Sequence, residues 1–224
     1  MSSLSEPTKK RLVVLYRLLQ QKIEEKRTST NESEGNLCIT SKCISELTGW
    51  TDATIRRDIS LLGIKCGAAK GYNASLLLAT IRTFLSPESC KDDRKCCIVG
   101  LESFGAALLN YTGFTNSDFT VVAGFDENVN RVELLNANFP LYPASKLEQV
   151  IQREKISYGI LAVPDGKANN YAQRLCKAGI TGIVNCTGAV LTVSEGVAIE
   201  NASVIGALQN LVAMRKENSS IHKN

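Results

Sequence analysis

The feature that most constrains the fold is an apolar segment in the middle of the chain that runs directly into a glycine turn. Residues Lys95 to Gly100 read K-C-C-I-V-G, and the segment L-E-S-F-G-A-A-L-L-N-Y follows. A second apolar segment, Thr120 to Phe125, ends at Asp126, which lies 21 residues beyond Gly105. An acid at that distance reaches the adenosine ribose in dinucleotide-binding proteins. Strand, glycine turn, helix and strand in this order predict the first unit of a Rossmann domain.

The same alternation continues toward the C-terminus and predicts a parallel sheet with helices on both faces. Apolar runs predict strands at Tyr158 to Val163 and Gly182 to Asn185. Helical periodicity predicts helices at Lys146 to Arg153 and Ala168 to Ala178. In the helix that follows the glycine turn, we expect three residues to face the sheet: Ala107, Leu108 and Tyr111. The second part of the chain is therefore predicted to be of the α/β class.

One residue of the glycine turn departs from the dinucleotide-binding fingerprint G-x-G-x-x-G. Glu102 occupies the position of the second glycine, which normally lets the backbone approach the pyrophosphate closely. Two like charges about 4 Å apart repel by roughly 4 kcal/mol at a surface-like dielectric. Either Glu102 turns outward, or the dinucleotide shifts, or the site has lost its ligand. The motif alone leaves these three alternatives open.

The first part of the chain has the outline of a helix-turn-helix. Apolar residues in Pro7 to Lys26 recur at three- and four-residue steps, which predicts a helix with one buried stripe. Thr40 or Ser41 is expected to cap a short second helix that ends near Gly49. After a tight turn, Thr51 or Asp52 is expected to cap a third helix, Ala53 to Leu62, as in DNA-binding helix-turn-helix proteins.

This third helix is a candidate DNA-recognition helix. Ile55, Ile59 and Leu62 share one face, which we expect to be buried. Polar residues at its start and on its outer side can reach base edges and phosphates. These candidates for DNA contacts are Thr51, Asp52, Thr54, Arg56, Arg57 and Ser60.

A glycine-rich segment after this helix, Gly63 to Tyr72, is predicted to form a β-hairpin wing whose Lys65 and Lys70 touch phosphates. The charge distribution agrees with a nucleic-acid partner for this part of the chain. Between Met1 and Ser86 there are 13 Lys and Arg against 8 Asp and Glu, whereas the remainder holds 13 against 14. A helical packing domain without a ligand is the alternative interpretation.

Composition limits the remaining function classes. The chain of 224 residues is 44% hydrophobic and 21% charged, as in ordinary globular proteins. Its only histidine, His222, stands near the C-terminus, so no mechanism that needs an internal histidine is expected. No apolar run approaches the length of about 18 residues that spans a membrane, and no export leader is recognisable. We therefore expect a cytoplasmic protein with no membrane partner.

Eight cysteines are present, and their spacing does not match the paired Cys-x-x-Cys ligands of structural zinc sites. They are Cys38, Cys43, Cys66, Cys90, Cys96, Cys97, Cys176 and Cys186. We predict buried, unreactive thiols and no metal site, with a metal-binding or redox-sensing thiol as the alternative.

Several longer segments match one known protein family in order along nearly the whole chain. They include I-R-R-D-I-S-L-L-G from Ile55 to Gly63 and C-I-V-G-L-E-S-F-G-A-A-L-L-N-Y-T-G-F from Cys97 to Phe114. Toward the C-terminus they include A-G-I-T-G-I-V-N from Ala178 to Asn185 and V-S-E-G-V-A-I-E-N from Val193 to Asn201. On these segments the chain resembles the Rex family of bacterial redox-sensing transcriptional repressors.

The resemblance implies a homodimeric DNA-binding repressor and not an enzyme. It implies a winged helix at residues 1–86, a Rossmann domain at residues 94–203 and a C-terminal helix at residues 204–216 that is exchanged between subunits. Such a protein binds an inverted-repeat operator and leaves it when NADH binds, so that it reports the NADH/NAD balance. No catalytic residue is implied.

Carried over from the family, Arg56 and Arg57 fall on the recognition helix, and the other site residues form two groups. The implied cofactor site comprises Gly100, Glu102, Ser103, Phe104, Gly105, Asp126, Val163 and Pro164. The implied switch network between the two domains comprises Arg11, Tyr111 and Ser203. Departures from the family pattern gather at these two places: Glu102 replaces a glycine, Ser203 replaces an acid, and N-C-T-G at residues 185–188 replaces N-F-A-P.

Two other functions remain open at this point. One is a DNA-binding relative of the family in which NADH sensing is lost or altered, as the departures around Glu102 would allow. The other is a Rossmann enzyme that binds NAD or CoA, such as a dehydrogenase. An enzyme would need a substrate domain and catalytic groups, whereas the extra domain here is basic and winged.

Overall fold

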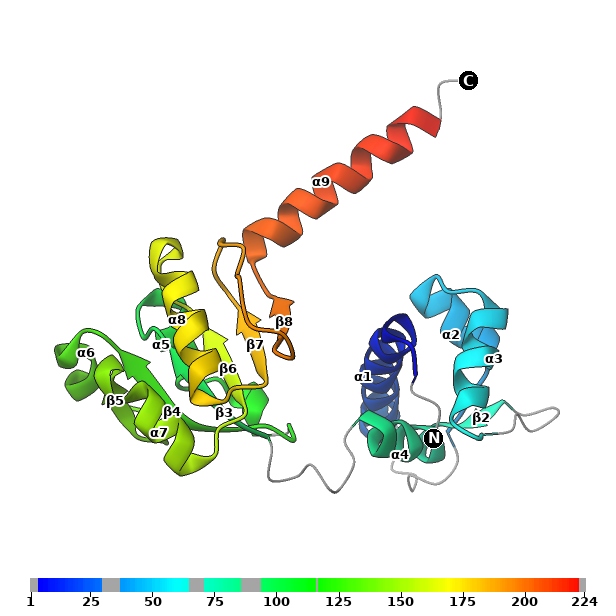
Figure 1. Ribbon diagram of the computed structural model, residues 1–224. Helices are drawn as coiled ribbons and strands as arrows, with labels where there is room; N and C mark the ends of the chain where they lie inside the picture. The colour runs from blue at the N-terminus through cyan, green and yellow to red at the C-terminus, as the bar shows by residue number, and fades with distance from the viewer. Residues whose placement is uncertain (1–3, 30–36, 65–70, 86–93, 116, 222–224) are drawn as a thin grey trace. The chain divides into compact units, whose positions relative to one another are not determined.

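The computed structural model of the chain describes residues 4–29, 37–64, 71–85, 94–115 and 117–221. Contacts divide the chain into two units, Met1–Lys91 and Asp92–Asn224 (Figure 1). Most of the segment expected to form a wing, including Lys65 and Lys70, lies outside the described residues.

The first unit is helical with one small sheet (blue to green in Figure 1). Its helices are α1 (Glu6–Ser29), α2 (Ser41–Thr48), α3 (Asp52–Leu61) and α4 (Ala74–Leu85). Two short strands, β1 (Cys38–Ile39) and β2 (Tyr72–Asn73), pair antiparallel. This pairing joins the segment between α1 and α2 to the segment before α4. The sequence patterns did not predict this long-range contact.

One apolar core holds the four helices of this unit together. Leu12 of α1 and Leu77 of α4 are completely buried. The expected buried face of the third helix is confirmed, because Ile55, Ile59 and Leu62 are all buried. Burying one such side chain contributes about 1.5–3 kcal/mol, so the core fixes the outward orientation of the opposite face of α3.

The predicted caps of the helix-turn-helix are also confirmed. Thr40 Oγ1 accepts a hydrogen bond from Cys43 N at the start of α2. Gly49 ends this helix with φ of 72°, a left-handed conformation that favours glycine. Thr51 then caps α3 by accepting from Thr54 N. These caps set the tight turn that presents α3.

The second unit contains a six-stranded sheet in which all neighbouring strands are parallel. Its strands are β3 (Lys95–Val99), β4 (Thr120–Asp126), β5 (Leu141–Pro143), β6 (Tyr158–Leu161), β7 (Gly182–Asn185) and β8 (Ala198–Asn201). The order β5-β4-β3-β6-β7-β8 is that of the Rossmann fold, with the reversal between β3 and β6. The predicted α/β class is therefore confirmed.

Helices and short helical turns connect these strands. They are α5 (Ser103–Leu108), η4 (Thr112–Phe114), α6 (Val129–Leu134), η5 (Ala144–Lys146), α7 (Leu147–Glu154), α8 (Asp165–Ala178) and α9 (Val204–Ile221). Successive residues of β3 point to opposite faces, so Ile98 and Val99 belong to two different apolar clusters. The sheet is thus covered on both faces, as predicted.

The structure corrects the prediction for the helix after the glycine turn. This helix ends at Leu108, after which the chain continues through η4. Ala107 and Tyr111 are exposed and only Leu108 is half-buried, so two of the three residues expected to face the sheet do not. The Tyr111 ring packs edge-on against Phe114, with centroids 5.6 Å apart.

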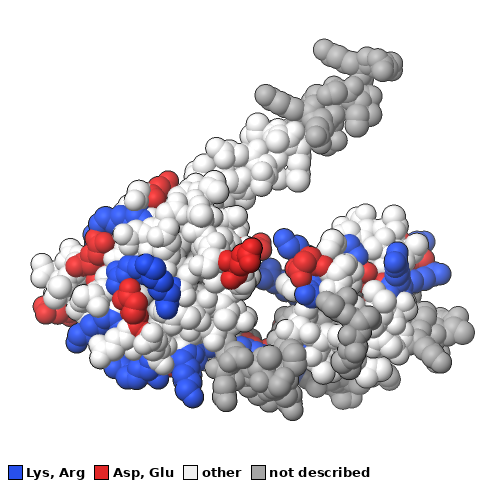
Figure 2. Space-filling view, viewed as in Figure 1, with Lys and Arg blue, Asp and Glu red and all other residues white. Residues whose placement is uncertain are grey.

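Apolar side chains cover α9 without being buried in the single chain. Val204, Ile205, Leu208, Leu211 and Val212 are each more than half exposed. No charged residue occurs between positions 204 and 214, so this part of the helix is white in Figure 2. None of the helices among the described residues is both long and apolar enough to cross a membrane.

The cysteines differ in their exposure. Cys96 and Cys97 are buried in β3, and burial raises the pKa of Cys96 to about 11 and that of Cys97 further still. The prediction of buried thiols is wrong for Cys38, which is exposed at the edge strand β1. Cys43, Cys176 and Cys186 are partly buried, and Cys66 and Cys90 lie outside the described residues.

Candidate functional site

Two glycines of the turn after β3 are required by the protein backbone itself. Gly100 has φ of 92°, and a Cβ on it would lie 2.5 Å from the carbonyl oxygen of Ala162. A Cβ on Gly105 would lie 1.7 Å from the carbonyl oxygen of Gly100. No side chain fits at either position, because the turn packs directly on the end of β6 and on the start of α5.

The middle position of the fingerprint, in contrast, does not require a glycine for the backbone to fold. Glu102 has φ of −76° and ψ of −151°, which any L-residue adopts without strain. Its carboxylate does not cap α5; Oε1 instead accepts a hydrogen bond from Arg131 Nη2 of α6 at 2.7 Å. Of the alternatives raised by the sequence, the structure shows Glu102 turned toward α6. A glycine here would serve the ligand and not the fold.

Asp126 lies at the end of β4, as expected, but its carboxylate oxygens accept hydrogen bonds mainly from other groups of the chain. Its side chain is 6% exposed, and Oδ2 accepts a hydrogen bond from Leu101 N at 2.7 Å. Oδ1 accepts from Asn128 N at 2.7 Å and from Arg131 Nη1 at 3.4 Å. A carboxylate has about four acceptor positions, so roughly one remains for a ribose hydroxyl.

A cavity of about 290 Å³ opens at the carboxyl ends of β3, β4 and β6, where Rossmann proteins bind their ligands. An adjoining cleft of about 490 Å³ shares part of this lining and extends to Ser203 at the start of α9. The structure brings most of the candidate cofactor residues to these two cavities: Gly100, Glu102, Ser103, Phe104, Asp126, Val163 and Pro164. Gly105 lies directly behind the turn.

Three charged residues of the cavity were not predicted from the sequence: Glu127, Arg131 and Lys167. The Glu127 carboxylate accepts hydrogen bonds from Lys167 Nζ and from Tyr171 Oη, and both contacts lower the pKa of Glu127. Burial, followed by this contact with Glu127, raises the pKa of Tyr171. The missed signal for Arg131 was its place five residues beyond Asp126, whereas no local pattern links Lys167 with Glu127, which is 40 residues away.

Ser203, assigned to the switch network, has a local role in the single chain. Its Oγ accepts a hydrogen bond from Gly206 N at 3.2 Å, at the start of α9. Residues 185–188, which differ from the family pattern, are also held by local hydrogen bonds. Asn185 Oδ1 accepts hydrogen bonds from both N and Oγ1 of Thr187. Both groups line the clefts beside α9.

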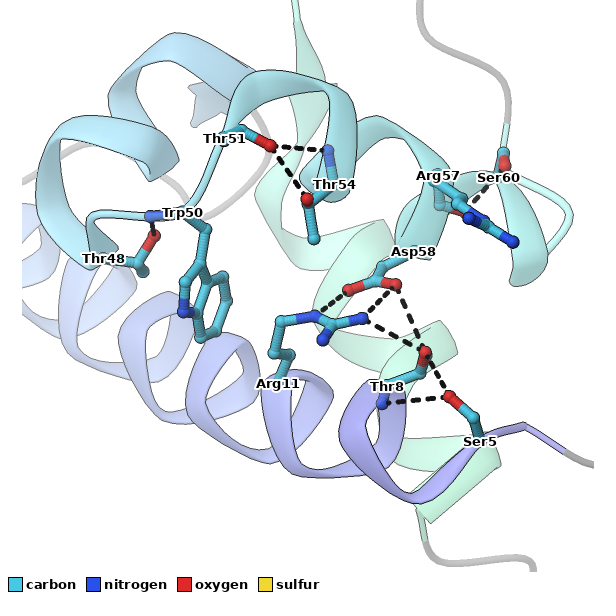
Figure 3. Close-up of polar contacts among 10 residues, drawn as sticks. All are labelled: Ser5, Thr8, Arg11, Thr48, Trp50, Thr51, Thr54, Arg57, Asp58 and Ser60. Atoms are coloured by element: carbon cyan, nitrogen blue, oxygen red, sulfur yellow. Dashed lines mark hydrogen bonds and ion pairs between the residues drawn. The ribbon is translucent and has the colours of Figure 1, made fainter.

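The start of α3, the candidate recognition helix, is shown in Figure 3. The hydroxyls of Thr51 and Thr54 lie 2.8 Å apart and stabilise the first turn, so Thr54 is half-buried rather than fully outward. Ser60 Oγ donates to the carbonyl oxygen of Arg57 at 2.7 Å. Of the predicted outer residues, Arg56, Arg57 and Ser60 are exposed.

The two arginines of this helix differ in their contacts. Arg56 forms an ion pair with Asp52 at 2.6 Å, and its Nε donates to Ser41 Oγ at 3.3 Å. Within the described part of the chain, no acceptor pairs with the Arg57 side chain. Arg57 is therefore the freer of the two cations for an external anion or base edge.

Asp58 is a buried acid of α3 that sequence patterns missed. It is 4% exposed and accepts hydrogen bonds from Arg11 Nε at 2.5 Å and Nη2 at 2.9 Å (Figure 3). Thr8 Oγ1 donates to the same carboxylate at 3.4 Å. The bond to Asp58 raises the pKa of Arg11. Arg11, assigned to a network with Tyr111, is thus bound within its own unit, where it links α1 to the recognition helix.

Family models match both units. A model described as "CoA binding domain" matches residues 91–189, and one described as "Putative DNA-binding protein N-terminus" matches residues 3–60. A redox-sensing transcriptional repressor Rex from an Exiguobacterium species is 31% identical over 207 residues, which cover 92% of this chain and 89% of that protein. A Rex from Bacillus licheniformis is 30% identical over 222 residues, which cover 99% and 98%.

Solved structures agree with the sequence comparison. RSP, a Rex-family repressor, in complex with NAD⁺ and operator DNA is 27% identical and superimposes with a TM-score of 0.82, covering 100% of this chain and 97% of that one. RSP in complex with NADH is 26% identical, with a TM-score of 0.79 and coverage of 100% and 99%. These similarities extend over both units and α9.

Proposed function

The chain belongs to the Rex family of redox-sensing transcriptional repressors, and on that basis we propose that it binds an inverted-repeat operator as a homodimer and releases it when NADH binds. It is a DNA-binding repressor and not an enzyme. The observation that carries this proposal is full-length similarity to a repressor seen with operator DNA and with NADH. A repressor of this kind acts where operator DNA is, so we place it in the cytoplasm.

The DNA-binding surface that we propose is the outer face of α3 together with its N-terminal cap. It includes the candidates Thr51, Asp52, Thr54, Arg56, Arg57 and Ser60, and we retain Lys65 and Lys70 for phosphates. Support comes from the buried opposite face of α3 and from the Arg57 guanidinium, which pairs with no acceptor among the described residues. Arginines on such a helix read guanine through a bidentate contact.

Arg57→Ala should weaken operator binding about 10- to 100-fold per half-site, because a bidentate arginine contact contributes about 1–3 kcal/mol of discrimination. Arg56→Ala should have a smaller effect, since Arg56 is already paired with Asp52 and Ser41. Fluorescence anisotropy of a labelled operator measures both. Equal losses for the two variants would contradict the distinction between them.

NADH and NAD are the ligands that we propose for the cavity at the ends of β3, β4 and β6. The residues present fit a dinucleotide in two respects. Gly100 and Gly105 bring the turn close to β6, where a Cβ would collide. Asp126 keeps about one acceptor position for a ribose hydroxyl, and Val163 and Pro164 line both cavities. The nucleotide supplies a redox signal, and the protein binds it without reacting.

The homodimer that we propose uses α9. Between positions 204 and 214 its surface is apolar and uncharged, as a helix exchanged between subunits requires, and we propose residues 204–216 for this role. We propose residues 1–86 as the DNA-binding domain and residues 94–203 as the dinucleotide-binding domain. Arg11, Tyr111 and Ser203 are proposed to relay nucleotide binding, with Arg11 acting on α3 through Asp58.

A titration of the DNA complex tests this function. A labelled duplex is first obtained by in vitro selection from random inverted repeats, and NADH and NAD are then added separately to the complex. NADH should lower the apparent operator affinity about 10-fold or more, which corresponds to a coupling free energy within the usual range. NAD should leave the complex in place. Anisotropy measured at fixed salt reports the result.

Two outcomes would contradict the proposal in different ways. Failure to select any bound duplex at modest salt would remove the repressor role, since non-specific contacts alone give weak binding. Tight binding that millimolar NADH leaves unchanged would keep the repressor role but show a protein that does not read the nucleotide.

A further inference from the structure

We propose that Arg131 is a positioning residue of the nucleotide site, which holds the Glu102 carboxylate against α6 and out of the path of the dinucleotide pyrophosphate. The site then accepts NADH although the middle glycine of the fingerprint is missing. This inference rests on the proposed binding of NADH and explains how this chain achieves it.

Because the backbone of the turn is unstrained, only the Glu102 side chain could interfere with a bound pyrophosphate. Gly100 and Gly105 keep the turn in the shape that packs on β6, and Glu102 is extended without strain. Replacing the middle glycine has therefore not deformed the turn. What a bound pyrophosphate would meet is a carboxylate, and its position depends on what that carboxylate binds.

Contacts of Arg131 fix that position. Nη1 lies 3.4 Å from Asp126 Oδ1, and Nη2 lies 2.7 Å from Glu102 Oε1. Asp126 is itself anchored by backbone N–H groups of Leu101 and Asn128. A lone ion pair at the surface contributes little. Here one end of the guanidinium is attached to a buried, anchored carboxylate, so the other end can hold Glu102 in place.

The balance of charges in the cavity explains why the Arg131–Glu102 ion pair matters for an anionic ligand. Among the described residues that line the cavity, three are acidic and two are basic. Glu127 is paired with Lys167, so Arg131 is left to balance both Glu102 and Asp126. Without Arg131, the uncompensated Glu102 carboxylate would face the negative charges of a pyrophosphate.

A double-mutant cycle tests this role. The proteins are the unaltered chain, Arg131→Gln, Glu102→Gly and the double variant, and NADH binding is followed by nicotinamide fluorescence. Arg131→Gln alone should raise the Kd for NADH about 10- to 100-fold, the range expected when a nearby charge is left uncompensated. Added to Glu102→Gly, the same substitution should raise it less than about threefold, because no carboxylate remains to be held.

Two further variants act as controls. Arg131→Lys should restore most of the affinity lost in Arg131→Gln, because it returns a cation to α6. Arg153→Gln removes an arginine of the same unit that pairs with Glu154 and lies outside the cavity lining, and it should leave NADH binding unchanged. The melting temperature of each variant reports whether it is folded.

The possible contrary results are distinct. Equal losses from Arg131→Gln in both backgrounds would mean that Arg131 contacts the nucleotide or acts through Asp126, and would overturn the positioning role while leaving NADH sensing intact. No loss in either background would overturn it as well. Binding only after Glu102→Gly would show that Arg131 fails to clear the site. Absence of NADH binding in all four proteins would remove the proposed cofactor together with this inference.

Discussion

Replacing Leu208 and Leu211 by glutamate should convert the protein to a monomer and weaken operator binding about 1000-fold or more, toward its non-specific level. Both side chains are more than half exposed on α9, on a stretch without any charged residue. Apolar surface of this extent is stabilised only when a partner covers it, at about 25 cal/mol per Å² buried. Two glutamates on that face would leave charges without water in the interface.

A matched control uses the opposite face of the same helix. Asn210→Glu with Ala213→Glu introduces the same charge at the same spacing, about 200° around the helix from Leu208 and Leu211. Sedimentation equilibrium should find this variant dimeric and the leucine variant monomeric, and anisotropy should find tight operator binding only in the control. If both variants stayed dimeric, α9 would not be the dimerisation element. If both became monomeric, the effect would be one of added charge.

The sequence predicted those parts of the fold in which local pattern and final environment coincide. The segment Lys95 to Asp126 contains a long apolar strand, two glycines that only the turn can explain, and an acid at the second strand end. Each of these features agrees with the structure, because each is recognised from residues that are close in the sequence. Thr40 and Gly49 are similar cases, since a cap is set by its immediate neighbours.

The parts that were missed depend on partners distant in the chain. The strands β5 and β8 are not continuous apolar runs, because β5 ends in a proline and β8 reads A-I-E-N, and they exist because the neighbouring strands pair with them. Without β5, the preceding helix α6 had no expected place, so Arg131 could not be connected with Glu102. Burial of Tyr111 was wrongly expected because the helix carrying it ends at Leu108.

Asp58 is the clearest instance in the DNA-binding unit. Its place in I-R-R-D-I-S-L-L-G gives an acidic residue on a helix that was interpreted only for its cations and apolar face. The partner, Arg11, is 47 residues earlier, and no periodicity links the two. Only the packing of α1 against α3 turns a residue that would otherwise be solvated into a buried ion pair.

Asp58→Ala should lower the free energy of unfolding of the first unit by about 1.5–3 kcal/mol, the loss of hydrogen bonds between a buried carboxylate and a partly exposed charged partner. Asp58 is 4% exposed, and two nitrogens of Arg11 together with the Thr8 hydroxyl donate to it. The substitution leaves that guanidinium without its carboxylate. Trp50, the single tryptophan of the chain, lies at the turn between α2 and α3 and reports unfolding by fluorescence in urea.

Two comparisons distinguish the loss of the Arg11–Asp58 ion pair from the loss of an acidic residue as such. Asp52→Ala removes the carboxylate of an exposed pair with Arg56 in the same helix and should cost less than about 1 kcal/mol. In an Arg11→Met background, Asp58→Ala should cost much less than in the natural chain, because no unpaired cation is left. Equal costs in the two backgrounds would show that Asp58 stabilises α3 on its own. A small cost at Asp58 would mean that α1 and α3 are held by their apolar core alone, and Arg11 could then not act on the recognition helix through this carboxylate.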